Sequence, residues 1–222
     1  MSRLDEILSV IKPVSVLADI GCDHGYISKK ALDNNLCKKL VFTDISEKCL
    51  LKAKTLLKTE VDKRLAVPVL ANGLTGVDIF IDEAVIAGMG GEEIIQILKE
   101  CLTRTGIKTL VLQPMKNTDK LRRFLVENGF YLERDYVFKD AGKFYDLIVA
   151  SLSDTPDFYT DLEYEFGREN LQNKSKAFKE KYLKEIESIN LWLQSPTIKE
   201  DSVLDFKAKI EKYQKVIFDH EN

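Results

Sequence analysis

The stretch Asp19-Ile-Gly-Cys-Asp-His-Gly-Tyr26 (DIGCDHGY) decides how the rest of this chain is interpreted. It follows an apolar run, Val14 to Ala18, that is typical of a buried strand, and it precedes residues 27–32, which are typical of a helix. Gly21 and Gly25 allow a tight turn and a close approach of the backbone to a ligand. Strand, glycine-containing turn and helix together indicate the first unit of a nucleotide-type binding fold.

The composition indicates a globular protein that buries a real core. Of the 222 residues, 45% are hydrophobic and 31% are charged, which is ordinary for soluble domains. No apolar run approaches the roughly 20 residues of a membrane span. The N-terminal stretch MSRLDEILSVIK lacks the apolar core of a signal peptide, so we expect a cytoplasmic protein without membrane association. The four cysteines, which form no CxxC pair, predict neither a metal site nor obligatory disulfides: Cys22, Cys37, Cys49 and Cys101.

The charge is unevenly distributed, although the net charge of −3 by itself does not indicate a nucleic-acid-binding protein. Residues 29–64 contain ten Lys or Arg and five Asp or Glu, and residues 173–184 contain five Lys and one Glu. Such stretches predict either a local phosphate-binding surface or solvated helix faces, and charge alone leaves both open.

The order of elements predicts the topology. After a short helix at residues 2–11, we expect strands at 14–20, 40–43, 66–70, 83–87 and 109–112, with helices at 26–34, 46–59, 92–101 and 118–128. Two further strands, 130–138 and 144–151, follow with a hairpin-length connection between them. This order predicts an α/β, Rossmann-like parallel sheet whose far edge contains an antiparallel strand. That is the topology of the seven-stranded S-adenosylmethionine-dependent methyltransferase fold.

The C-terminal part of the chain has a different pattern. Apolar residues recur at spacings of three and four in residues 178–193 and again in 203–217, with Ser195-Pro196 between the two series. This predicts an antiparallel helical hairpin with a period close to that of a coiled coil. We therefore expect a catalytic domain over 1–155 and a helical appendage over 156–222, which is either a substrate-binding arm or a purely structural or dimerising pair of helices.

Polar and glycine-rich segments follow the predicted parallel strands, and they meet at one edge of the sheet. Asp44 comes roughly 20 residues after the first turn, where a carboxylate accepts from ribose hydroxyls. Asn72, before Gly73, offers a donor and an acceptor to an adenine edge. The segment Ala87–Gly91 (AGMGG) follows the fourth strand. Each feature is weak alone, but in this order they predict a site for an adenosyl ligand.

Asp19 distinguishes between possible cofactors. A buried carboxylate before the turn would repel the pyrophosphate of NAD, which prefers bare backbone N–H groups. It suits a ligand that carries an ammonium and a sulfonium. S-adenosyl-L-methionine carries both and is therefore the expected cofactor.

The pocket for the acceptor needs polar residues from outside the AGMGG loop, because that loop has no Asp, Asn or Tyr. Gln113 and Asn117, in the segment QPMKN after the fifth predicted strand, can contact a base edge, and Asp23 and His24 are the other candidates. The alternative for this segment is a loop that is only rigid.

Five motifs together carry a family resemblance: DIGCDHGY, ANGL, IAGMGG, LQPMKN and AGKFYDLIVA. In this order, followed by a helical hairpin, they resemble the bacterial tRNA (adenine(22)-N1)-methyltransferase family over essentially the whole chain. The chain departs from the family at Cys22, where relatives often have Ser, at Gly25, where they often have Ala, and at Asp44, where they frequently have Glu. We expect the first two changes to have little effect.

The resemblance implies roles for individual residues. The residues implied to bind the methyl donor are Asp19, Gly21, Cys22, Asp23, His24, Tyr26, Asp44, Ile45, Asn72, Gly73, Gly88, Met89 and Gly90. Those implied to act on the target base are Asp23, Gln113 and Asn117. The implied partner is tRNA, for which the helical appendage over 156–222 would be the recognition arm. No metal is expected, and a monomer is favoured.

The implied reaction is an in-line methyl transfer to adenine N1, which has its own lone pair and needs no base to activate it. Positioning and tolerance of a cationic product therefore matter most. The base must be unpaired or flipped out, and Tyr26, Phe144 or Tyr145 could stack on it. The alternatives are a methyltransferase acting on another RNA or a small molecule, a ligand sensor without activity, and an NAD-dependent oxidoreductase.

Overall fold

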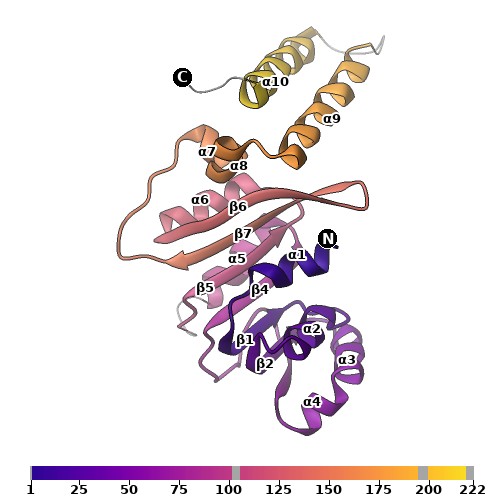
Figure 1. The fold of residues 1–222 in the computed structure, drawn as a ribbon, viewed down its shortest axis with the longest axis vertical. Coiled ribbons are helices and arrows are strands. Elements are labelled where there is room, and N and C mark those ends of the chain that lie inside the picture. The colour runs from indigo at the N-terminus through magenta and orange to yellow at the C-terminus, as the bar shows by residue number, and fades with distance from the viewer. Residues whose placement is uncertain (1, 102–105, 195–199, 219–222) are drawn as a thin grey trace.

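A computed structural model describes residues 2–101, 106–194 and 200–218. Its centre is a seven-stranded sheet in the order β3-β2-β1-β4-β5-β7-β6 (Figure 1). The strands are β1 (Val14–Ile20), β2 (Cys37–Asp44), β3 (Ala66–Leu70), β4 (Glu83–Met89), β5 (Thr109–Pro114), β6 (Phe130–Asp140) and β7 (Lys143–Leu152). The first five strands pair in parallel, and β7 is antiparallel to both β5 and β6. The predicted seven-stranded Rossmann-like fold is confirmed.

The helices that cover the sheet are α1 (Arg3–Val10), α2 (Tyr26–Asp33), α3 (Glu47–Leu56), α4 (Lys58–Asp62), α5 (Gly91–Cys101) and α6 (Thr118–Glu127). Several predicted boundaries differ from the observed ones, and the two largest differences have a structural cause. β2 begins at Cys37 rather than Leu40, because pairing of Val14 with Cys37 extends the strand through two lysines. The helix expected over 46–59 is divided at Leu57, whose side chain is fully buried in the core.

The core has two layers, one on each face of the sheet. On one face, Ile94 and Leu98 of α5 and Leu121 of α6 pack against the strands. On the other face, helices α1, α2 and α3 contribute residues that include Ile7 and Ala53. Because the central strands are buried on both faces, they have nearly continuous apolar sequences, and this is why they could be predicted from the sequence.

The C-terminal part contains more than the predicted hairpin. Two short helices, α7 (Asp161–Phe166) and α8 (Arg168–Asn173), precede the long helices α9 (Lys176–Leu193) and α10 (Glu200–Phe218). The hairpin of α9 and α10 lies at one end of the molecule, and α3 and α4 lie at the other (Figure 1). Its buried residues are Phe178, Tyr182, Ile186, Ile189, Tyr213, Val216 and Ile217. The predicted break at Ser195-Pro196 lies outside the described residues.

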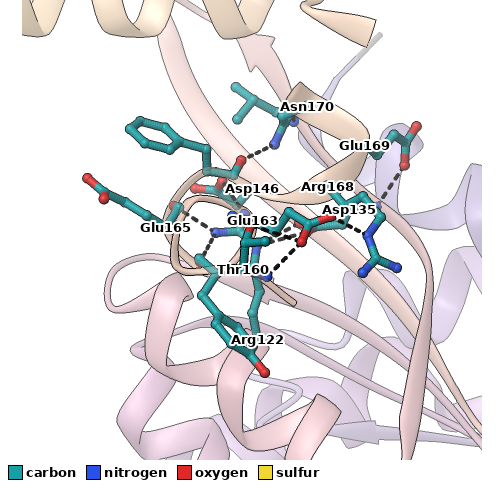
Figure 2. Close-up of polar contacts among 12 residues, drawn as sticks. Arg122, Asp135, Asp146, Thr160, Glu163, Glu165, Arg168, Glu169 and Asn170 are labelled. Atoms are coloured by element: carbon teal, nitrogen blue, oxygen red, sulfur yellow. Dashed lines mark hydrogen bonds and ion pairs between the residues drawn. The ribbon is translucent and has the colours of Figure 1, made fainter. Parts of the chain in front are cut away.

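The side chain of Arg122, on α6, joins the sheet to the C-terminal helices (Figure 2). Its guanidinium is buried, and Nε lies 2.9 and 2.8 Å from the two carboxylate oxygens of Asp135 on β6. Nη1 donates to two carbonyl oxygens of α7, each at 3.1 Å, and Nη2 donates to Asp146 at 3.3 Å. Lys181 of α9 donates to the same Asp146 at 2.9 Å. The C-terminal helices are therefore held to the sheet by buried charges.

Helix α8 also covers the edge of the sheet. β6 is the last strand in the sheet, so its outer N–H groups have no strand partner. The carboxylate of Glu169 accepts from the N–H of Asp135 at 2.7 Å, and Asn170 Oδ1 accepts from the N–H of Val137 at 2.9 Å (Figure 2). These side chains satisfy donors that would otherwise invite pairing with another chain.

Glu83, the first residue of β4, should make stability depend on pH. Its side chain is 1% exposed, and Oε1 has no hydrogen-bond partner. Burial raises the pKa of Glu83 from 4.5 to about 7. The folded state thus binds this proton more tightly than the unfolded state, so the stabilisation is present below pH 4.5 and is lost as the pH rises through 7. Relative to Glu83→Gln, we expect the wild type to lose roughly 2–3 kcal/mol of unfolding free energy between pH 5 and pH 8.

Urea unfolding at the two pH values measures this difference. Asp78→Asn is the matched control, because Asp78 is an exposed acid on the loop after β3. An equal pH dependence in wild type and Glu83→Gln would contradict the prediction.

Candidate functional site

Two cavities lie at the edge of the sheet where the parallel strands end. The larger, about 730 Å³, is lined by the turn after β1, the end of β4, helix α1 and the β6–β7 hairpin. The predicted donor residues that line it are Asp19, Gly21, Cys22, Asp23, His24, Tyr26, Gly88 and Met89. The smaller, about 180 Å³, contains the predicted residues Asp44, Ile45, Asn72 and Gly73. Gly90 lines neither of these two cavities and lies against the side chain of Lys116.

The two cavities meet at Gly21 and Met89, which line both. A Cβ at Gly21 would lie 1.9 Å from Met89 Cε, so the Met89 side chain covers the glycine turn. A ligand that spans both cavities must therefore displace this side chain. Methionine is unbranched and flexible, so its side chain can move aside at a small cost in free energy.

The turn after β1 is held by the neighbouring strand. The N–H groups of Gly21 and Cys22 both donate to the carbonyl oxygen of Thr43, at 2.8 and 2.9 Å. Gly25 is also constrained, because its φ is +75° and a Cβ there would lie 2.9 Å from the Cβ of Ala53. The expectation that Gly and Ala are equivalent at Gly25 is thus not supported in this chain, where α3 leaves no room for a side chain.

Asp19 is a buried carboxylate at the base of the larger cavity. Its side chain accepts from Ser28 Oγ at 2.6 Å and from the Ser28 N–H at 3.2 Å. Burial raises the pKa of Asp19 to about 6, and the two hydrogen bonds from Ser28 oppose the shift. Within the part of the chain that the structure describes, no cation forms a salt bridge with it. An ammonium group in the cavity would therefore stabilise the ionised form.

Asp44 connects the two halves of the site. One carboxylate oxygen accepts from the N–H of Asp23 at 3.0 Å, and the other accepts from the N–H of Ser46 at 2.8 Å. Ser46 also caps α3, because its hydroxyl accepts from the N–H of Cys49. The Asp44 carboxylate thus fixes the glycine turn through its hydrogen bond with Asp23, and it also lines the smaller cavity beside Asn72.

Asp23, His24 and Lys52 form a chain of polar contacts at the rim of the larger cavity. His24 Nδ1 lies 2.6 Å from the Asp23 carboxylate, and His24 Nε2 lies 3.1 Å from Lys52 Nζ. A protonated lysine can only donate, so Nε2 accepts and the imidazole proton is on Nδ1. The hydrogen bond from His24 lowers the pKa of Asp23. His24 also stacks on Tyr26, with the ring planes 3° apart, and Tyr26 is 60% exposed.

Gln113 and Asn117 lie outside the larger cavity. Gln113 is fully buried, its Oε1 accepts from Arg3 Nε at 2.6 Å, and its Nε2 donates to the Pro114 carbonyl oxygen at 2.9 Å. Asn117 is the N-cap of α6, and its carbonyl oxygen would lie 2.3 Å from a Cβ at Gly91. Of the three residues predicted to act on the base, only Asp23 lines the larger cavity.

Two charged residues of the larger cavity, Arg3 and Asp140, were not predicted from the sequence, whereas Tyr145, predicted as a ring that could stack on the base, does line it. Asp140 and Tyr145 lie on the β6–β7 hairpin, far along the chain from the glycine turn. Arg3 carried a signal, because a cation in the first turn of a helix opposes the helix dipole and has to be explained by another interaction.

No helix in 2–101, 106–194 or 200–218 is long and apolar enough to cross a membrane. In those same ranges, no three side chains from His, Cys, Asp and Glu are grouped so as to hold a metal ion.

Comparisons with known proteins agree on one family. A sequence profile of the tRNA (adenine(22)-N(1))-methyltransferase family matches residues 17–215. The Bacillus subtilis tRNA (adenine(22)-N(1))-methyltransferase is 29% identical over 168 residues, which cover 74% of this chain and 70% of that one. A candidate tRNA methyltransferase of Mycoplasma pneumoniae is 35% identical over 132 residues, 60% of this chain but only 61% of the relative's length.

Solved structures agree in fold over nearly the whole chain. A Streptococcus pneumoniae candidate tRNA (m1A22) methyltransferase, in complex with S-adenosyl-L-methionine, is 26% identical with a TM-score of 0.86, covering 98% of this chain and 100% of that chain. M. capricolum TrmK, in complex with S-adenosyl-homocysteine, is 26% identical with a TM-score of 0.84, covering 97% of each chain.

Proposed function

The chain belongs to the tRNA (adenine(22)-N(1))-methyltransferase family, and we propose that it transfers the methyl group of S-adenosylmethionine to N1 of adenine 22 in tRNA. The observation that carries the proposal is the buried Asp19 carboxylate, which has no cation partner among the described residues and lies in the cavity beside the glycine turn. This arrangement suits a positively charged donor and is unfavourable for an anionic dinucleotide.

The two cavities suggest how the donor is held. In the smaller cavity, Asp44 would accept from the ribose hydroxyls and Asn72 would contact the adenine edge. In the larger cavity, Asp19 would hold the ammonium end, and the backbone at Gly88 would contact the methionine part. When bound, S-adenosylmethionine supplies an electrophilic methyl group on a sulfonium.

The residues of this chain position the target adenine and stabilise its charge. Tyr26 presents an exposed ring at the cavity rim on which an unpaired base can stack. Asp23, ionised and close to the rim, stabilises the positive charge that the base acquires on methylation. His24 does not act as a base, because both of its nitrogens are engaged by Asp23 and Lys52. Gln113 is buried and its side chain is hydrogen-bonded to Arg3, so it does not contact the target base directly.

We assign catalysis to residues 1–155 and tRNA recognition to residues 156–222, in a cytoplasmic enzyme that acts as a monomer. Helix α9 supports the recognition role, because Lys176 and Lys184 are exposed on it. Lys184 Nζ lies 5.4 Å from the centroid of the Phe144 ring on β7, and the next residue of that strand, Tyr145, packs on the other face and lines the larger cavity. A phosphate backbone that follows α9 would therefore contact the same hairpin that contributes Tyr145 to the cavity.

The proposed function is tested by incubating the protein with S-adenosylmethionine and two tRNA transcripts that differ only at position 22, adenine or guanine. Digestion to nucleosides should give 1-methyladenosine from the first transcript and none from the second. Equal methylation of both transcripts, or methylation only of other RNA or small molecules in a cell extract, would support the alternative methyltransferase reading.

Asp23→Asn should lower the rate of methyl transfer by roughly 100-fold, because a neutral amide no longer stabilises the cationic base. Donor affinity should change by less than about threefold, because Asp23 reaches Asp44 through its backbone N–H, which the variant keeps. Single-turnover kinetics and calorimetry measure the two quantities. Asp33→Asn, on the outer end of α2, is the control, and an undiminished rate in Asp23→Asn would refute the electrostatic role.

The double variant Lys176→Glu/Lys184→Glu should weaken tRNA binding and leave donor binding unchanged. Removal of two phosphate contacts should reduce the slope of log K against log salt by about two. The matched control is Lys207→Glu/Lys209→Glu, which makes the same charge change on the exposed face of α10. If the α9 and α10 variants bind tRNA as tightly as the wild type, the hairpin has a structural or dimerising role instead.

A further inference from the structure

One face of helix α3 supports the glycine turn. Cys49, Lys52 and Ala53 lie three and four residues apart, so their side chains point to the same side of the helix. Ala53 packs against Gly25, where a Cβ would lie 2.9 Å from the Ala53 Cβ. Cys49 donates a hydrogen bond to the Asp23 carboxylate. Lys52 carries a charge, and it reaches the turn through a histidine rather than through an acid.

The ammonium of Lys52 is directed at the imidazole of His24. Lys52 Nζ lies 3.1 Å from His24 Nε2, and within the ranges that the structure describes no carboxylate forms a salt bridge with Lys52. A second ring proton on Nε2 would set two donors and two positive charges against each other. The contact therefore keeps the imidazole neutral.

A neutral imidazole leaves Asp23 with its full negative charge. The carboxylate is 63% exposed at the cavity rim, and His24 Nδ1 donates to it at 2.6 Å, which lowers the pKa of Asp23. A neutral donor has this effect without cancelling the charge. An imidazolium at the same distance would form an ion pair and reduce the stabilisation that the carboxylate offers to a cationic base.

Three titratable side chains from three elements face the imidazole. They are Asp23 on the glycine turn, Tyr26 at the start of α2 and Lys52 on α3. The two ring nitrogens point in different directions, so the ammonium lies across the ring from the carboxylate. Lys52 thus acts on Asp23 through the protonation state of His24.

We propose that Lys52 is a positioning residue for methyl transfer, which acts through His24 to keep Asp23 free to stabilise the cationic base. The inference rests on the proposed function and on the role of Asp23 in it. A phosphate contact between Lys52 and tRNA is the competing explanation, and it predicts a different result in the kinetics.

Lys52→Met should give methyl transfer a new dependence on pH. At saturating donor and tRNA, its single-turnover rate should lie within about threefold of the wild type near pH 8.5 and fall roughly tenfold further behind near pH 6, because Nε2 can then take a proton. Lys52→Arg keeps a cationic donor against Nε2 and should restore the wild-type profile. Lys48→Met removes the same charge from an exposed position one turn earlier on α3 and should follow the wild type.

The imidazole ¹⁵N chemical shifts measure the contact independently of activity. The chain has two histidines, so a His220→Gln background leaves only the signal of His24. In a pH titration, Nε2 should take up its proton at a higher pH in Lys52→Met than in the protein with Lys52. An unchanged titration of Nε2, or a rate lowered equally at both pH values, would overturn the proposal.

A raised KM for tRNA with an unchanged rate at saturation would overturn it in favour of a phosphate contact. If the wild-type protein methylates no tRNA while Nε2 titrates as expected, the proposed function fails. The catalytic role of Lys52 then fails with it, although the Lys52–His24 contact is confirmed.

Discussion

Asp44→Ala should weaken binding of S-adenosylmethionine by at least about 100-fold while the protein stays folded. Two contributions add in the same direction. The ribose hydroxyls lose a charged acceptor, and hydrogen bonds to charged groups contribute roughly 1.5–3 kcal/mol each. The N–H groups of Asp23 and Ser46 also lose their acceptor, so the glycine turn and the start of α3 are no longer held together.

Calorimetry with S-adenosyl-homocysteine measures this loss, and circular dichroism confirms folding. Glu47→Ala is the matched control, because it removes an exposed acid three residues further along the chain. Asp44→Glu should retain binding to within about tenfold, since the longer carboxylate can still reach a ribose. Wild-type affinity in Asp44→Ala would show that the smaller cavity does not hold the ribose.

Arg122→Met should lower the free energy of unfolding by about 3–5 kcal/mol, because it leaves buried carboxylates without their cation. The Asp135 side chain is 1% exposed, and both of its carboxylate oxygens accept a hydrogen bond from Arg122 Nε. In this variant Asp146 would lose its salt bridge with Arg122 and keep the one with Lys181. For a chain of this size, the loss corresponds to a fall in Tm of roughly 6–20 °C.

Urea unfolding measures this change, and the neighbouring Arg123→Met is the control. Arg123 is about half exposed and pairs with the exposed Asp161, so its loss should cost less than about 1 kcal/mol. The double variant Arg122→Met/Asp135→Leu should be more stable than Arg122→Met alone, because the unpaired charge is then removed as well. Stability of Arg122→Met within 1 kcal/mol of the wild type would contradict the buried network.

The pattern of the chain determined the sheet and the approximate position of the donor site. Apolar runs ending in DIGCDHGY, Asp44 and Asn72 indicate parallel strands, and parallel strands place their carboxyl ends at one edge of a sheet. The strand order confirms the topology, and the cavities contain most of the residues implied by the resemblance. These features could be predicted because each depends on a local run of residues and on a rule of topology that holds for any sequence.

Only the tertiary structure decided which polar groups face the cavity and which are buried behind it. The sequence predicts that Gln113 contacts the target adenine, but its side chain is buried and hydrogen-bonded to Arg3, 110 residues away in the chain. Arg122 was read as part of a helix, yet it joins β6 and β7 to the C-terminal helices. The physical reason is that the burial and charge partners of a side chain are set by elements distant in sequence, whereas periodicity reports only on neighbours within a few residues.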